Sequence, residues 1–236
     1  MLSKNQESFS KDNLDMYLKE LAKEFRKLNG TSMPAKIILV GEAAILTNYG
    51  FREMTTDIDA VIHASSSMKD AIIRVRDKYN LPNGWINTDF VKTSSYSSRL
   101  DEFSIYYRTF ANVLTVRTIS AEYLIAMKLR AGRKYKHDLS DIIGILAEHE
   151  KIGAPISIDA IDSAVTNLYG GWDDFPQESK SFITSALATG HYQEIFASIQ
   201  KEENHAKNIL VEFEENYPDV MTESNVDTIL KSLKSK

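Results

Sequence analysis

The apolar positions near the amino terminus repeat every three or four residues from Leu14 to Leu28. This spacing predicts an amphipathic helix, because one face of such a helix is apolar. Asn29 and Gly30 follow the last apolar position and predict the end of the helix. We expect its apolar face to pack on the segments that follow.

Two short apolar runs come next, at 36–40 and 58–63, and both are rich in branched side chains. Runs of this length and composition predict strands. The first run ends at Gly41, and the residues from 43 to 49 between the two runs predict a short helix. The order is therefore strand, glycine turn, helix, strand.

A third helix is predicted from Ser67 to about Asn80, because Ser67 and Asp70 have the spacing of a helix cap. After this helix the pattern of apolar and polar residues is typical of strands as far as residue 119. The best strand candidates there are residues 103–107 and 113–119.

After residue 119 the periodicity is helical to the end of the chain. Ser120 and Asp138 are placed to cap the first two helices of this half. Further helices are predicted at 157–170, 177–189, 191–216 and 222–234. We therefore predict two domains, an α/β domain over 1–119 with an N-terminal helix and a helical domain over 120–236. This segregation predicts an α+β fold followed by a helical bundle.

The composition of the 236 residues narrows the chemistry. The chain has no cysteine, which excludes disulfides, a thiolate nucleophile and a cysteine zinc site. The formal net charge of -5 neither requires nor excludes a nucleic-acid partner. The polar amino terminus and the lack of an apolar run near the roughly 18 residues of a membrane span predict a cytoplasmic protein without a membrane partner.

Asp57 and Asp59 are the most informative pair. On a strand, a spacing of two places both carboxylates on one face, where they repel each other unless a cation lies between them. Oxygen ligands of this kind suit Mg²⁺ or Mn²⁺. The alternative is that Asp57 caps a turn and Asp59 is solvated on an edge strand. The turn at Gly41 favours the metal site, because the helix start after it offers backbone amides to a phosphate.

The stretch from Gly41 to Asp59, with the pattern R-x-x-T-x-D-I-D at 52–59, resembles the polymerase-beta-type nucleotidyltransferase superfamily. This resemblance implies that Asp57 and Asp59 hold the metal ions and that the turn holds the triphosphate of a nucleotide. We accordingly assign Gly41, Glu42 and Thr56 to nucleotide binding.

The segments LPNGWIN at 81–87 and EYLIAMKLRAGRKYKHDLSDI at 122–142 resemble the bacterial branch related to AbiEii-type toxins. The whole resemblance covers roughly residues 35–150. It implies a nucleotidyltransferase-like mixed sheet with flanking helices. It also implies that the first two helices of the helical domain complete the active site. By this resemblance Lys128 is catalytic, and the nucleotide-binding residues include Arg133, Lys136, Asp138 and Asp141.

Two positions depart from the superfamily pattern. Glu42 stands where a second Gly or Ser of the turn is usual, and an acidic side chain there repels a triphosphate unless it points away or joins the metal shell. A third strand carboxylate has no clear counterpart, since the strand at 113–117 offers Thr115 and Arg117 instead. Asp89 and Glu102 are the remaining candidates.

Five cations gather in the first helices of the carboxyl-terminal half: Lys128, Arg130, Arg133, Lys134 and Lys136. They either neutralise a triphosphate or RNA backbone, or form a solvated helix end. Lys128 shares a helical face with the apolar Leu124 and so needs an anionic partner. Asp138 is either an N-cap or a functional group, and Asp141 is placed to pair with Arg133 or Lys128.

The leading hypothesis is a metal-dependent transferase that moves a nucleoside monophosphate from an NTP to an acceptor hydroxyl. The resemblance favours an RNA or tRNA acceptor and a toxin-antitoxin setting with an antitoxin partner. One rival is a non-catalytic binding or regulatory module on the same fold. Another is a small-molecule adenylyltransferase of the aminoglycoside type. The last third of the chain predicts bundle packing or a homo-oligomer interface.

Overall fold

The computed structural model describes residues 8–133, 135–222 and 225–234. They form two compact units. The first runs to Leu124 and also includes Ala164–Gly170, and the second consists of Ile125–Ser163 and the chain from Gly171 onward. The first division follows Leu124, and the domain boundary after Ile119 stays a prediction. The return of Ala164–Gly170 to the first unit was not predicted.

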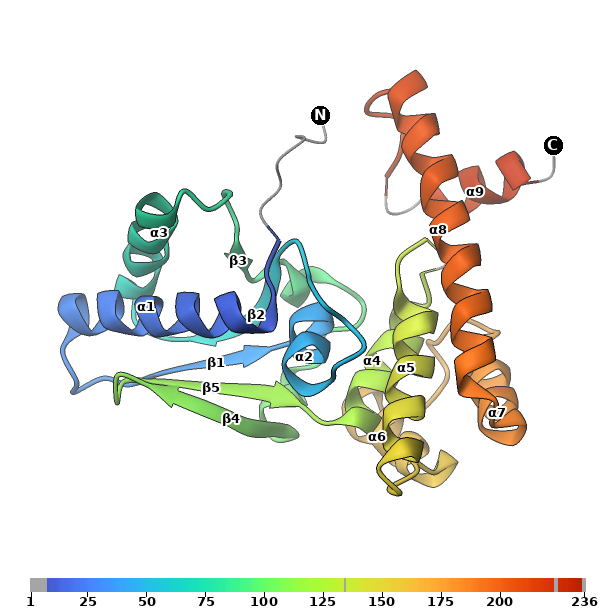
Figure 1. Cartoon of the computed structure of the whole chain (residues 1–236), viewed down its shortest axis with the longest axis horizontal. Coiled ribbons are helices and arrows are strands. Elements are labelled where there is room, and N and C mark those ends of the chain that lie inside the picture. The colour runs from blue at the N-terminus through green and yellow to red at the C-terminus, as the bar shows by residue number, and fades with distance from the viewer. Residues whose placement is uncertain (1–7, 134, 223–224, 235–236) are drawn as a thin grey trace. The chain divides into compact units, whose positions relative to one another are not determined.

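The first unit contains a mixed sheet (Figure 1). Its strands are β1 (Ala35–Leu39), β2 (Ile58–His63), β3 (Ile86–Asn87), β4 (Ser104–Phe110) and β5 (Leu114–Ile119). Their order across the sheet is β3-β2-β1-β5-β4. β1 pairs with β2 antiparallel and with β5 parallel, β2 pairs with β3 parallel, and β4 pairs with β5 antiparallel. The mixed α+β fold is confirmed.

Three helices accompany these strands: α1 (Lys11–Asn29), α2 (Gly41–Asn48) and α3 (Ser67–Tyr79). α1 and α3 pack against each other and against one face of the sheet (Figure 1). Alternate strand residues such as Ile37, Ile58 and Val116 enter this core. Because side chains alternate along a strand, Asp59 on β2 and Arg117 on β5 project from the opposite face.

The second half of the chain is helical in its described part, as predicted. The helices are α4 (Ala121–Ala131), α5 (Asp138–Lys151), α6 (Ile158–Tyr169), α7 (Ser179–Thr189), α8 (Tyr192–Asn216) and α9 (Val226–Lys234). Of the three divisions between the units, the first falls within α4, the second within α6 and the third directly after Gly170. Within the second unit, Ala206 and Leu210 of α8 pack on Val226 and Leu230 of α9.

Two of the predicted helix caps are wrong. Ser67 is the first residue of α3 and not its cap; the N-cap is Ser66, whose side chain makes no capping bond. Asp138 is likewise the first residue of α5, and the N-cap is His137. Of the helices that the structure describes, none combines the length and the apolar character that crossing a membrane requires.

Candidate active site

The turn at Gly41 lies directly beside Asp59. The Val40 amide donates to the Asp59 carbonyl over 3.0 Å, which ties the end of β1 to β2. Gly41 has φ 56, and a methyl group added to it would lie 3.6 Å from Oδ2 of Asp59. α2 begins at this residue, so its first amides are close to the carboxylate. The predicted combination of a phosphate-binding turn and a metal-binding carboxylate is geometrically possible here.

Asp57 differs from its predicted position. β2 begins at Ile58, so Asp57 occupies a bend one residue before the strand and is exposed. Asp59 is half-buried on the strand itself. The two carboxylates therefore come from different local structures, a bend and a strand.

Glu42 is held by two residues of the segment before β2. Its Oε2 lies 3.1 Å from Nη1 of Arg52 and 3.1 Å from Oγ1 of Thr55. The Thr55 hydroxyl is also 3.1 Å from the Asp57 carbonyl, so it can donate to either oxygen. The guanidinium of Arg52 offsets the negative charge of Glu42, which reduces the repulsion of phosphates that this position implies.

Arg52 and Thr55 are site residues that the sequence reasoning did not select. Both are fixed positions of the pattern R-x-x-T-x-D-I-D, so this pattern is the signal that could have identified them. Thr55 is only 2% exposed, whereas the selected Thr56 is exposed. Asn87 was missed as well: the pairing of β2 with β3 sets it beside Asp59. No local pattern predicts that neighbour.

A third carboxylate does not come from β5 in this structure. Thr115 and Arg117 share the sheet face of Asp59, and Nε of Arg117 donates to Oγ of Ser104 over 2.6 Å. The candidates Asp89 and Glu102 are exposed and lie in the connection between β3 and β4. Asp89 pairs with Lys92 at 2.7 Å, and Glu102 lies 3.3 Å from Arg99.

Within the described parts of the chain, no three acidic or histidine side chains meet in a group that suits a metal ion. The carboxylates of Asp57 and Asp59 supply the oxygen donors that Mg²⁺ prefers, and metal binding by this pair stays a prediction. This ion is commonly held by one or two carboxylates, with substrate phosphates and water completing its shell.

The second unit brings four of the predicted residues together. Lys128 is 5% exposed, and its Nζ lies 2.9 Å from Oδ1 of Asp138 and 2.7 Å from Oδ2 of Asp141. Arg133 binds Asp138 through Nε at 2.8 Å and Nη2 at 3.2 Å. The predicted anionic partner of Lys128 is thus present, and Asp141 pairs with Lys128.

The electrostatics of this cluster favour the ionised form of Asp138. Burial by itself raises the pKa of Asp138, but the charges of Lys128 and Arg133 and their hydrogen bonds outweigh burial and hold the pKa well below its usual range. Two cations then face two carboxylates. The side chain of Arg133 is 34% exposed and is the member of the cluster best able to reach a ligand.

The other cations of the basic segment have separate surroundings. Arg130 lies 3.4 Å from Asp174 and over the ring of Phe175, which indicates a packing role. Lys136 is exposed in the turn before α5. Lys134 lies outside the described residues.

A family model described as a nucleotidyltransferase of unknown function, DUF6036, matches residues 16–168. The chain belongs to this family. The resemblance to the nucleotidyltransferase superfamily is therefore confirmed, while the AbiEii-type branch stays a prediction. Searches of curated proteins and of solved structures gave no match.

The DUF6036 segment includes both groups of residues, Asp57 with Asp59 in the first unit and Lys128 with Asp138 in the second. It ends before α7, α8 and α9. The second group is joined by ion pairs within its own unit. That the two groups make one active site remains a prediction.

Proposed function

We propose that this DUF6036 protein is a metal-dependent nucleotidyltransferase that transfers a nucleoside monophosphate from an NTP to an acceptor hydroxyl. The contact between the Gly41 turn and Asp59 carries the proposal. It sets helix-start amides, which favour phosphate, beside a carboxylate that suits Mg²⁺ or Mn²⁺.

In the proposed reaction the acceptor oxygen attacks the α-phosphorus. The bond to the bridging oxygen of the β-phosphate breaks, pyrophosphate leaves, and the hydroxyl proton passes to water. A metal ion held by Asp57 and Asp59 would lower the charge on the phosphate and activate the attacking oxygen. The amides at the start of α2 bind phosphate oxygens, and Arg52 keeps Glu42 from opposing them.

Lys128 and Arg133 would stabilise charge on the triphosphate and on the leaving pyrophosphate. Arg133 is partly exposed and can contact phosphate directly. The buried Asp138 and Asp141 hold the two cations in place. Lys136 is exposed in the adjoining turn and adds positive charge there.

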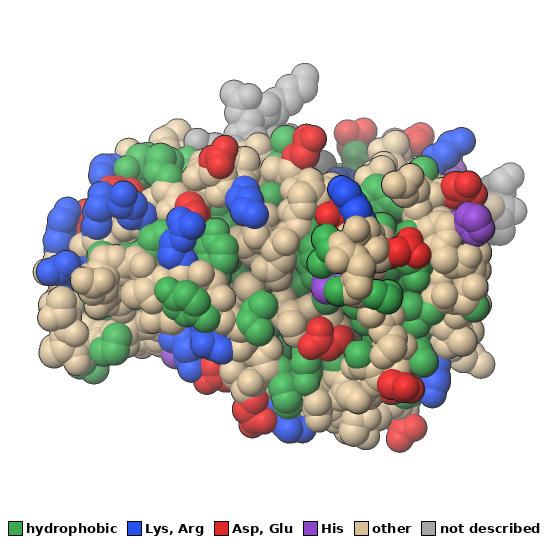
Figure 2. Space-filling model, turned by 60° about the horizontal axis from the view of Figure 1, so that its bottom comes forward, with side chains coloured by type: hydrophobic (Ala, Val, Ile, Leu, Met, Phe, Trp, Pro, Cys, Tyr) green, Lys and Arg blue, Asp and Glu red, His purple; other side chains and the backbone are tan. Residues whose placement is uncertain are grey.

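The acceptor and the setting rest on the family resemblance: an RNA or tRNA end, and a toxin-antitoxin pair. Figure 2 shows both acidic and basic side chains on the face that it draws, which by itself decides for neither RNA nor a small molecule. A small-molecule acceptor is therefore tested alongside RNA.

One observation favours a second function, a non-catalytic nucleotide-binding module. On the sheet face of Asp59, β5 carries Thr115 and Arg117 and lacks the carboxylate that commonly serves as base. Such a module would bind NTP with Mg²⁺ but transfer nothing.

The test is incubation of the protein with each α-labelled NTP, Mg²⁺ or Mn²⁺, and total RNA, cell extract or aminoglycosides. We expect labelling by the wild type and at least about a hundredfold less by Asp59→Asn, because electrostatic groups at a reaction centre have effects of this size. Asp77→Asn is the control, since Asp77 is exposed on α3 and paired with Arg76.

Calorimetry with the same NTPs separates the two functions. Binding without any labelled product supports the non-catalytic module. Absence of both binding and labelling, or equal labelling by wild type and Asp59→Asn, rejects the proposed transferase.

A further inference from the structure

The start of α5 lacks a cap from its own segment. The N-cap residue His137 makes no side-chain bond to the helix. The carboxylate of Asp138, the first helical residue, is engaged by Lys128 and Arg133. The first amides of a helix have no partner within the helix, so those of Leu139 and Ser140 need an acceptor from elsewhere.

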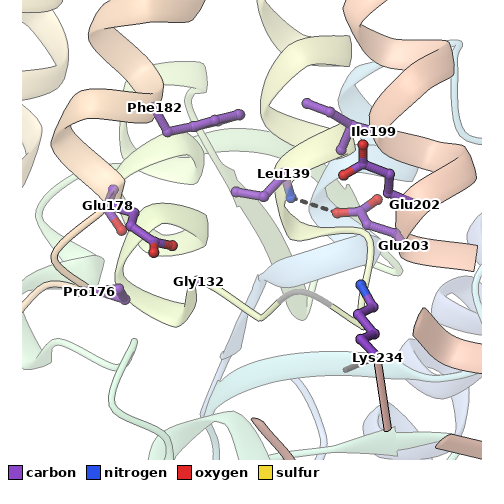
Figure 3. A pocket seen from close by; sticks show the side chains of 10 residues that line it. Gly132, Leu139, Pro176, Glu178, Phe182, Ile199, Glu202, Glu203 and Lys234 are labelled. Atoms are coloured by element: carbon purple, nitrogen blue, oxygen red, sulfur yellow. Dashed lines mark hydrogen bonds between the residues drawn. The ribbon is translucent and has the colours of Figure 1, made fainter. Parts of the chain in front are cut away.

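Glu203 on α8 supplies this acceptor. Its Oε1 accepts from the Leu139 amide at 3.0 Å and from the Ser140 amide at 3.3 Å, and its Oε2 accepts from the Ser140 hydroxyl at 2.5 Å. Oε2 also lies 3.5 Å from Nδ1 of His137. Figure 3 shows Glu203 directed at Leu139. Glu203 is 3% exposed. The amide donors and the dipole of a helix start stabilise a carboxylate buried beside it.

The turn that Glu203 holds also carries the acidic partners of the site cations. Asp138 and Asp141 lie in the first turn of α5, and both contact Nζ of Lys128. Asp138 also binds Arg133. A shift of this turn would therefore move both carboxylates and the two cations with them.

We propose that Glu203 is a positioning residue for the nucleotide site, acting through the first turn of α5 on Lys128 and Arg133. This inference rests on the proposed function. Glu203 lies beyond the segment that the DUF6036 model matches, so α8 contributes to the site's geometry in addition to packing.

A cavity of about 350 Å³ lies beside this contact within the second unit (Figure 3). Glu203 and Leu139 line it together with Phe182 and Ile199. When the carboxylate is removed, water can enter from the cavity and bind the exposed amides, which limits the loss of stability. We expect a Glu203→Ala variant to fold.

The test compares Glu203→Ala and Glu203→Gln with Glu202→Ala, a control that loses the same charge at the neighbouring, exposed position of α8. Hydrogen exchange of a peptide over 138–141 measures the contact itself. Exchange should accelerate in Glu203→Ala, remain slower in Glu203→Gln because its amide oxygen still accepts, and stay unchanged in the control.

Steady-state transfer kinetics measure positioning. In Glu203→Ala we expect the KM for the NTP to rise about tenfold, as for the loss of hydrogen bonds to a charged group. The kcat should stay within about threefold, because Asp57 and Asp59 are unchanged. A purely structural role would instead lower kcat through the active fraction and leave KM unchanged. Glu203→Gln should recover part of the affinity.

An unchanged KM in Glu203→Ala, with accelerated exchange, overturns the positioning role. Unchanged exchange overturns the contact. If the wild type neither binds nor transfers any NTP, the proposed function fails and positioning of a nucleotide site fails with it, while the exchange result still decides the contact.

Discussion

Gly41 serves the candidate site through its backbone. Its φ of 56 is in the left-handed region, where a side chain costs free energy, and it approaches the Asp59 carboxylate closely. The residue lets α2 begin immediately after β1, so that helix amides and a strand carboxylate face the same small volume.

Replacing Gly41 with alanine should therefore have two effects. Alanine is strained at this positive φ, which should lower the free energy of unfolding by about 1–2 kcal/mol. The new methyl group, 3.6 Å from Oδ2 of Asp59, should also weaken Mg²⁺-dependent NTP binding, since it occupies space that phosphate or metal-bound water needs. Urea unfolding and calorimetry measure the two effects separately.

Gly84→Ala is the matched control. Gly84 also has a positive φ, of 74, but an added methyl group would have open space around it. We expect a similar loss of stability with unchanged NTP binding. Equal NTP affinity in the two variants would show that the turn at Gly41 does not hold the nucleotide.

At the level of single residues, the candidates selected from the sequence come from local patterns, although Arg52 and Thr55 of such a pattern were not selected. The spacing of Asp57 and Asp59 and the lysine on the apolar side of α4 are local properties, and Lys128 does have anionic partners. Asn87 and Glu203 were missed because strand pairing and helix packing bring them in from distant segments. A single sequence carries no direct record of such contacts.

The helices show how a start is stabilised by different partners. α1 has a local capping box: the Asn13 amide donates to Oγ of Ser10 at 3.4 Å, and the Ser10 amide donates to Oδ1 of Asn13 at 2.8 Å. α3 begins after Ser66 without a capping bond from that side chain. The predicted cap Ser67 instead lies 3.5 Å from Oδ1 of Asn29.

Ser10→Ala should therefore lower the free energy of unfolding by about 1 kcal/mol, the usual cost of removing a serine N-cap. Ser66→Ala removes the same hydroxyl from an N-cap that makes no capping bond, so its effect should be much smaller. Chemical denaturation of both variants measures the difference. Equal losses would mean that the hydroxyl of Ser10 does not stabilise α1.

Element positions were predicted well because they depend on periodicity along the chain. The predicted strand at 58–63 coincides with β2, and the predicted helices of the second half appear as α4 to α9. Cap residues were less predictable. A serine or aspartate near a helix start caps it only if it lies at the N-cap position and no stronger partner competes. Asp138 is instead the first residue of α5, and its carboxylate binds Lys128 and Arg133.

At the scale of the whole molecule, acidic groups with lowered pKa values occur in both units. Lys36 binds Asp101, which lowers the pKa of that carboxyl in the first unit, and Asp138 is its counterpart in the second. Glu20 of α1 binds Lys23 of the same helix and Lys78 of α3, each at 2.5 Å. Such groups favour the folded state only while they are ionised.

The pKa of Glu20 sets the pH range over which its contribution to the stability of the fold is lost. Hydrogen bonds from Lys23 and then Lys78 lower its pKa from 4.5 to about 2, although burial opposes them. Because the unfolded chain binds the proton at higher pH, the stabilisation from Glu20 is complete above pH 4.5 and is lost as the pH falls toward 2. The pKa values of Asp138 and Asp101 are also lowered in the folded protein. The free energy of unfolding should therefore decrease as the pH falls through the acid range.

Glu20→Gln tests the argument, because glutamine keeps the shape but cannot ionise. The variant should be less stable than the wild type at pH 7, and the difference should shrink steadily between pH 4.5 and pH 2. Urea unfolding at a series of pH values measures it. A difference that stays constant over this range would mean that the charge of Glu20 does not stabilise the fold through its ion pairs with Lys23 and Lys78.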